Sequence, residues 1–174
     1  MLTLPPIPSW QAIHPLVVHF PIVLLLIAPL FIVIGLLRKP NRSFPFLLVA
    51  LILMSLGTTS TFVAASSGQA AGESVENTQA KAVLEQHEEL AETTEIAFSA
   101  LTLIFAAILL VPRLLRQERT LVISTFLPLV FLMFYATGAI TLANTAHQGG
   151  RLVHELGVRA QMEPGTAIES GERE

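Results

Sequence analysis

The chain has 174 residues, of which 52% are hydrophobic and only 13% are charged, and its mean hydropathy is +0.65. This composition is typical of an integral membrane protein and lies outside the usual range of soluble domains. The net charge of −3 gives no indication of nucleic-acid binding, and the absence of cysteine excludes disulfides, zinc–thiolate sites, iron–sulfur clusters and covalent c-type haem attachment.

Four helices are predicted in chain order, at residues 13–37, 44–68, 78–112 and 120–147. The first contains no charged residue until its end and is about 37 Å long as a helix, which is enough to span a bilayer with some tilt. No Lys or Arg precedes Arg38, so this helix is expected to be retained in the membrane rather than removed as a signal peptide. In the fourth, Gly149 and Gly150 are expected to end or bend the helix.

Charge in the connecting segments predicts the topology. The link after the first helix carries Arg38, Lys39 and Arg42, and the link after the third is also rich in arginine. Short basic loops stay in the cytoplasm, and the glutamate-rich link after the second helix then lies outside. We therefore expect an all-α, integral membrane, four-helix up-down-up-down bundle over residues 1–160, with both termini outside. The third helix should extend beyond the outer face, and residues 161–174 should form a disordered tail.

Histidines gather at the outer end of this predicted bundle. Counting from the inner end of each helix puts His14, His87 and His147 at about 35 to 39 Å and His19 at about 27 Å. Three helices thus bring a histidine to one level, as a shared ligand site requires. Because His14 precedes Pro15 and lies about 140° around the helix from His19, His14 is expected to cap the helix and His19 to be the better buried ligand.

Two glutamates of the third predicted helix lie close to the level of His19. Glu92 and Glu95 are expected at about 24 to 29 Å, where the apolar segment begins. Carboxylates at this boundary are candidates for carrying protons or for hydrogen-bonding the ligands from behind. Small residues recur every four positions on the second and fourth helices, which favours close helix packing or leaves a slot for a flat cofactor.

Three interpretations fit these residue types. Haem b needs axial histidines from facing helices, small residues beside the macrocycle and no cysteine. A mononuclear Zn, Cu or Fe site needs three nitrogen or carboxylate ligands. In a structural or assembly subunit, the histidines would only cap helices and contact lipid headgroups. No nucleophilic triad or phosphate-binding loop is present to indicate another chemistry.

Four short motifs stand out along the chain: His14-Pro15 with Val18-His19-Phe20-Pro21-Ile22, Ser67-Gly68-Gln69-Ala70-Ala71-Gly72-Glu73, Glu85-Gln86-His87-Glu88, and His147-Gln148-Gly149-Gly150-Arg151-Leu152-Val153. Together they resemble the motifs of the bacterial inner-membrane family catalogued as domain of unknown function 2231. The resemblance covers residues 10–160 and implies a four-helix membrane module that occurs beside Rieske-type or cytochrome c domains. It implies respiratory electron transfer through a b-type haem, with His14, His19, His87 and His147 as the histidines of interest.

The leading prediction is an electron-transfer subunit, rather than an independent enzyme, that binds haem b at the outer face of the bacterial cytoplasmic membrane. It would belong to a larger respiratory or redox complex with Rieske-type or cytochrome c partners. His19 and His87 are the expected axial ligands. His14 and His147 would form a second pair, or would contact haem propionates or a quinone.

Overall fold

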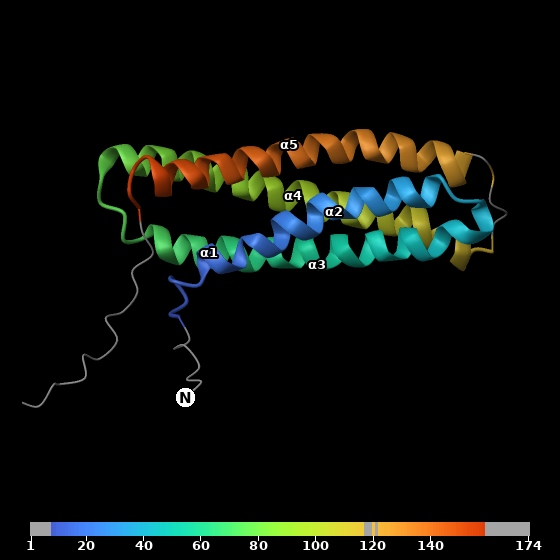
Figure 1. The fold of residues 1–174 in the computed structure, drawn as a ribbon, viewed down its shortest axis with the longest axis horizontal. Coiled ribbons are helices and arrows are strands. Elements are labelled where there is room, and N and C mark those ends of the chain that lie inside the picture. The colour runs from blue at the N-terminus through green and yellow to red at the C-terminus, as the bar shows by residue number, and fades with distance from the viewer. Residues whose placement is uncertain (1–7, 117–119, 121, 159–174) are drawn as a thin grey trace, which may run out of the picture.

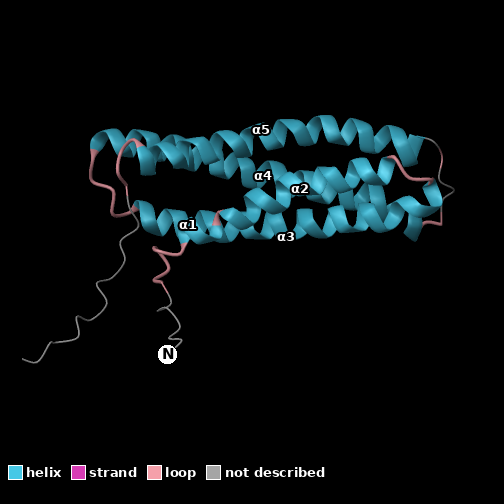
Figure 2. Cartoon of the chain, in the orientation of Figure 1, coloured by secondary structure: helices cyan, strands magenta, loops and turns pink. Residues whose placement is uncertain are grey.

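The computed structural model describes residues 8–116, 120 and 122–158, which form four long helical segments packed side by side (Figure 1). The first consists of α1 (His14–Val17) and α2 (His19–Leu36), joined by Val18 in a helical conformation. The second is α3 (Pro40–Gly72) and the third is α4 (Thr78–Leu114). In the fourth, a π-helical turn, η1 (Val122–Phe126), leads into α5 (Leu127–His154). The secondary structure of the described residues is entirely helix and loop (Figure 2), which confirms the predicted all-α, up-down-up-down bundle.

Helix ends follow local capping chemistry in some places and packing in others. Helix α4 begins at Thr78, as predicted, because the Asn77 side chain accepts hydrogen bonds from the backbone N–H groups of Gln79 and Ala80. The two glycines expected to end or bend the last helix, Gly149 and Gly150, do not end it, since α5 continues through both to His154. The predicted tail, residues 161–174, lies outside the described residues.

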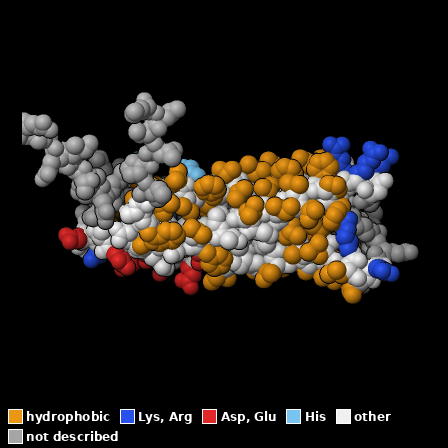
Figure 3. All heavy atoms as spheres, turned by 90° about the horizontal axis from the view of Figure 1, so that it is seen from below, with side chains coloured by type: hydrophobic (Ala, Val, Ile, Leu, Met, Phe, Trp, Pro, Cys, Tyr) orange, Lys and Arg blue, Asp and Glu red, His pale blue; other side chains and the backbone are white. Residues whose placement is uncertain are grey.

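All four segments are long and apolar enough to cross a membrane, and the surface has the corresponding distribution of side chains. In Figure 3, hydrophobic side chains cover the middle of the bundle, Lys and Arg gather at one end, and Glu, the only acidic residue type in the chain, gathers at the other. We call these the basic end, where α2 meets α3 and α4 leads to η1, and the acidic end, where α3 meets α4. At the basic end, the guanidinium of Arg113 lies 3.3 Å from the centre of the Phe44 ring.

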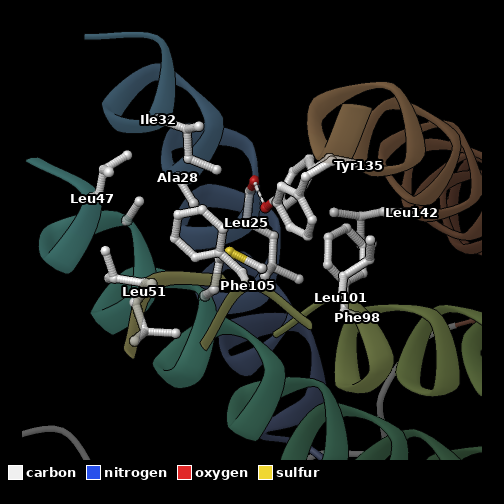
Figure 4. Close-up of a cluster of buried hydrophobic side chains, with 14 residues drawn as sticks. Leu25, Ala28, Ile32, Leu47, Leu51, Phe98, Leu101, Phe105, Tyr135 and Leu142 are labelled. Atoms are coloured by element: carbon white, nitrogen blue, oxygen red, sulfur yellow. Dashed lines mark hydrogen bonds between the residues drawn. The ribbon is translucent and has the colours of Figure 1, made fainter. Parts of the chain in front are cut away.

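The hydrophobic core occupies the middle of the bundle and extends toward the basic end (Figure 4). Helix α2 packs mainly on α3, and α4 packs mainly on α5. Aromatic side chains join these two pairs: Phe98 and Phe105 of α4 pack against Tyr135 and Phe131 of α5, with ring centres 5.4 and 4.9 Å apart. The core therefore holds the pairs together at this depth.

A hydrogen bond between distant helices accompanies a proline in α2. Pro29 has no N–H, so the carbonyl of Leu25, four residues earlier, lacks its usual partner within the helix. The buried hydroxyl of Tyr135 on α5 donates to this carbonyl instead (Figure 4). Satisfying every backbone polar group is essential in an apolar environment, so this contact fixes α5 against α2.

Candidate functional site

A cavity of about 700 Å³ lies at the acidic end, between the two helix pairs. Residues from every helix, α1 to α5, contribute to its lining. Its walls are largely apolar and include Val18, Ile22, Ala65, Leu142 and Leu152. The volume falls in the range of cofactor and small-molecule pockets, and apolar walls with a few polar groups are typical of them.

His14, at the start of α1, contributes one imidazole to this cavity. Its Nδ1 lies 2.8 Å from the carbonyl oxygen of Ala64 on α3 and 3.2 Å from the hydroxyl of Ser67. The Ser67 hydroxyl itself donates to the Ala64 carbonyl. Because a carbonyl only accepts, Nδ1 must carry the proton, and the neutral ring then has its lone pair on Nε2. A ring fixed in this way offers Nε2 to a ligand in the cavity.

His87, on α4, is held in the same manner from the other side of the cavity. Its Nδ1 donates to the carbonyl of Thr145 on α5 over 2.9 Å. The hydroxyls of Thr145 and Thr94 lie 3.0 Å apart and join α5 to α4 at this level. The Nε2 of His87 is therefore also the unprotonated nitrogen. The two imidazoles therefore line the same cavity, one from each pair of helices.

A glycine makes room for each of these rings. A Cβ atom placed on Gly68 would lie 2.8 Å from Cε1 of His14, and one placed on Gly149 would lie 3.2 Å from Cε1 of His87. Both distances are shorter than ordinary carbon–carbon contacts. Each glycine stands four residues, or about one helical turn, after the carbonyl that accepts from the histidine. The cavity therefore has two halves of the same design, one from α1 and α3 and the other from α4 and α5.

This close approach explains why a glycine is found at position 149, inside α5 rather than at its end. Glycine in a helix costs about 1 kcal/mol relative to alanine, and helix ends are a common place for it. At Gly149 the missing side chain instead admits the His87 ring. An interior glycine in an otherwise regular helix often has a packing reason, so the sequence indicated a close contact at Gly149. It did not indicate that the contact is with the His87 ring.

The structure separates the predicted histidines into two groups. His14 and His87 line the cavity, whereas His19, on α2, and His147, on α5, are exposed on the outside of the bundle and do not line it. His154 is exposed at the end of α5. The expected pairing of His19 with His87 is thus not the pairing that the fold brings together. Depth along the helices placed His14, His87 and His147 near one level and His19 lower, but rotation about each helix axis decides which of them face inward.

Carboxylates of α4 form the polar side of the cavity. Five glutamates contribute to the lining, whereas none of the described lysines or arginines does; they are Glu85, Glu88, Glu89, Glu92 and Glu95. Glu92 is exposed, but Oε1 of Glu95 is buried and has no hydrogen-bond partner among the described residues. Both predicted glutamates therefore lie at the site, and they differ in their contact with solvent.

The described residues do not include a group of three or more His, Cys, Asp or Glu side chains placed to hold a metal ion. The cavity instead offers two imidazole nitrogens from facing helices, with carboxylates along one side. Two imidazoles of this kind could hold a metal-containing cofactor that brings most of the metal's ligands with it.

Comparison with known proteins defines the family. No curated protein and no solved structure gives a significant match to the chain. The model of the family described as "Predicted membrane protein (DUF2231)" matches residues 11–162, a range that includes His14, His87 and both glycines beside them. Because this match covers most of the chain and four of its helices can span a membrane, the protein belongs to this family of membrane proteins.

Proposed function

We propose that the protein is a b-type cytochrome-like electron-transfer subunit that binds haem between His14 and His87. The observation that supports this most strongly is the pair of imidazoles in one cavity, each with Nδ1 tied to a carbonyl of the neighbouring helix. A buried histidine hydrogen-bonded in this way is oriented for coordination through Nε2, and the hydrogen bond makes that nitrogen a stronger donor.

The residues present fit a haem in several respects. Two histidines suffice, because the porphyrin supplies the other four nitrogen ligands of the iron. The glycines beside the rings and the apolar walls suit a flat, hydrophobic macrocycle. With no cysteine in the chain, the group would be held without covalent attachment, as in b-type cytochromes.

In this proposal the chain supplies ligands and an environment, and the haem, when bound, supplies one-electron redox chemistry. His14 and His87 would hold the iron, and the carbonyls of Ala64 and Thr145 would fix the orientation of their rings. Val18, Ile22 and the other apolar residues of the lining would limit access of water, which is one way a protein adjusts the reduction potential.

We further propose that the site lies near the outer face of a bacterial cytoplasmic membrane. The basic end carries Arg38, Lys39 and Arg42 where α2 meets α3, and Arg113 in the last turn of α4, and short basic loops favour the cytoplasm. The cavity at the opposite end would then be close to outer-face electron-transfer partners, such as a Rieske-type or cytochrome c protein, or to a quinone. The exposed glutamates there favour partners with a basic surface.

Visible spectroscopy of single-histidine variants tests the haem proposal. Wild-type protein purified under haem-replete conditions should show a Soret band and an α band in its reduced-minus-oxidised spectrum. His14→Ala and His87→Ala should each lose these bands, because each removes an axial ligand. His19→Ala and His147→Ala are matched controls on the outside of the bundle and should retain them. A wild-type protein without porphyrin, or loss of haem only in the control variants, would contradict the proposal.

A non-haem metal site is the second candidate, and the carboxylates favour it. Five glutamates line the cavity, and none of the described lysines and arginines does. Haem propionates would therefore lack a cationic partner in the lining. Imidazole with carboxylate is a ligand set used for Zn, Cu and Fe. Elemental analysis would decide between the two: stoichiometric metal without porphyrin, lost in His87→Ala, supports the non-haem site.

A further inference from the structure

Glu95 is the least exposed of the five glutamates that line the cavity. Its Oε1 is buried and accepts no hydrogen bond from the described residues, and the side chain contributes to the cavity wall. A carboxylate charge is costly where water is excluded and no donor compensates it. Charges also interact more strongly in such surroundings than in water. The Glu95 side chain is partly exposed, but through its buried oxygen a change of charge in the cavity affects it more directly than it affects the four exposed glutamates of the lining.

A stripe of carboxylates connects Glu95 to the acidic end. Glu85, Glu88, Glu92 and Glu95 are spaced by three, four and three residues, which places them on one face of α4. All four line the cavity, and the first three are exposed. From Glu85 to Glu95 the helix rises about 15 Å, with roughly one turn between neighbours. Within the stripe, the exposed Glu92 lies about one turn from Glu95 and can exchange a proton between water and the Glu95 carboxylate.

The other titratable groups in the lining are few and have other neighbours. They are His14 on α1 and, on α4, His87, Glu89 and the other three glutamates of the stripe. The two histidines keep their Nδ1 protons on backbone carbonyls and would bind iron through Nε2. Helices α3 and α5 contribute neutral polar groups, such as Thr61, Gln69 and Thr145. Glu95 is therefore the group best placed to compensate an added charge.

We propose that Glu95 takes up a proton when the site takes up an electron. This inference rests on the proposed haem site. One electron arrives from a one-electron donor protein, one proton arrives from water by way of the exposed Glu92, and an O–H bond forms at the Glu95 carboxylate. When the electron passes to the acceptor, this O–H bond breaks and the proton returns to water by the same route. Charge in the cavity is thus unchanged by reduction.

Redox titration at a series of pH values tests this coupling. In the wild type, the midpoint potential should fall as the pH rises, because proton uptake becomes less favourable. At full coupling the reduction equilibrium constant falls about tenfold per pH unit. Glu95→Gln should remove this dependence over the same range of about pH 5 to 9. Glu76→Gln is the matched control: it removes an exposed carboxylate of the acidic end that does not line the cavity, and it should keep the wild-type pH dependence.

A measurement on the wild type makes the test independent of how well the variant folds. The reduced-minus-oxidised infrared difference spectrum should contain the C=O band of a protonated carboxylic acid, shifted in D₂O. The inference is overturned if that band is missing, or if haem-loaded Glu95→Gln keeps the wild-type pH dependence, and either result leaves the haem proposal intact. Absence of haem from the wild type overturns the proposed function, and this inference with it.

Discussion

At the scale of single residues, a backbone carbonyl decides what each cavity histidine can do. The carbonyls of Ala64 and Thr145 accept from Nδ1 of His14 and His87, so both rings are fixed with the lone pair on Nε2. A glycine one turn beyond each carbonyl leaves space for the ring. Histidine, carbonyl and glycine thus form a unit, and the chain contains this unit twice.

The glycines should therefore be sensitive to a single added methyl group. Gly68→Ala and Gly149→Ala should weaken haem binding on the order of 10-fold, because a displaced ligand ring is comparable to the loss of a group that orients a metal ligand. The effect should be larger at Gly68, where the added Cβ would lie 2.8 Å from the ring, than at Gly149, where it would lie 3.2 Å away. Haem titration of the apoprotein, followed by its absorbance, measures both.

Gly150 provides the matched control for these variants. It follows Gly149 in α5, and a Cβ placed there would meet no other atom within 4 Å. Gly150→Ala should leave haem affinity unchanged and should stabilise the helix by up to about 1 kcal/mol. Equal loss of haem from all three variants would show that helix composition, rather than contact with the rings, explains the effect.

At the scale of elements, a side chain of α5 supplies a hydrogen bond that the backbone of α2 lacks. Pro29 leaves the Leu25 carbonyl without its helical partner, and Tyr135 supplies the hydrogen bond from α5. Phe98 and Phe131 pack against the same tyrosine ring. The hydrogen bond that α2 lacks at Pro29 is thereby replaced by one that links the two helix pairs, between the cavity and the basic end.

Tyr135→Phe should lower the free energy of unfolding by about 1 to 3 kcal/mol, since it leaves a buried carbonyl without a donor. Chemical unfolding in detergent micelles, followed by circular dichroism, measures this change. Pro29→Ala restores an N–H four residues after Leu25, so Tyr135→Phe should cost less in that background than in the wild type. Equal costs in both backgrounds would show that the hydroxyl acts through something other than the Leu25 carbonyl.

At the scale of the whole molecule, the separation of charge between the two ends predicts how the protein lies in the membrane. Acidic side chains surround the cavity end, basic side chains occupy the other, and apolar side chains cover the surface between them (Figure 3). The basic segments should stay in the cytoplasm. The predicted orientation, with the cavity outside, follows from this distribution and awaits a direct test.

Single cysteines can report this orientation, because the chain contains none of its own. Ser74 at the acidic end and Asn41 at the basic end are both exposed. In intact cells, a membrane-impermeant thiol reagent should label Ser74→Cys, whereas Asn41→Cys should be labelled only after the membrane is permeabilised. The reverse pattern would place the basic end outside and contradict the prediction.

The sequence by itself determined the spans, the start of α4 at Thr78 and the gathering of histidines and glutamates toward one end. These features are local: backbone groups in an apolar medium must be paired within the helix, so composition and length identify the spans, and Asn77 caps α4 through its own side chain. The tertiary structure alone decided that His14, rather than His19, shares the cavity with His87, and that Gly149 continues α5 instead of ending it. Both depend on how each helix is rotated against its neighbours, which contacts between helices set and the hydropathy of one helix does not specify.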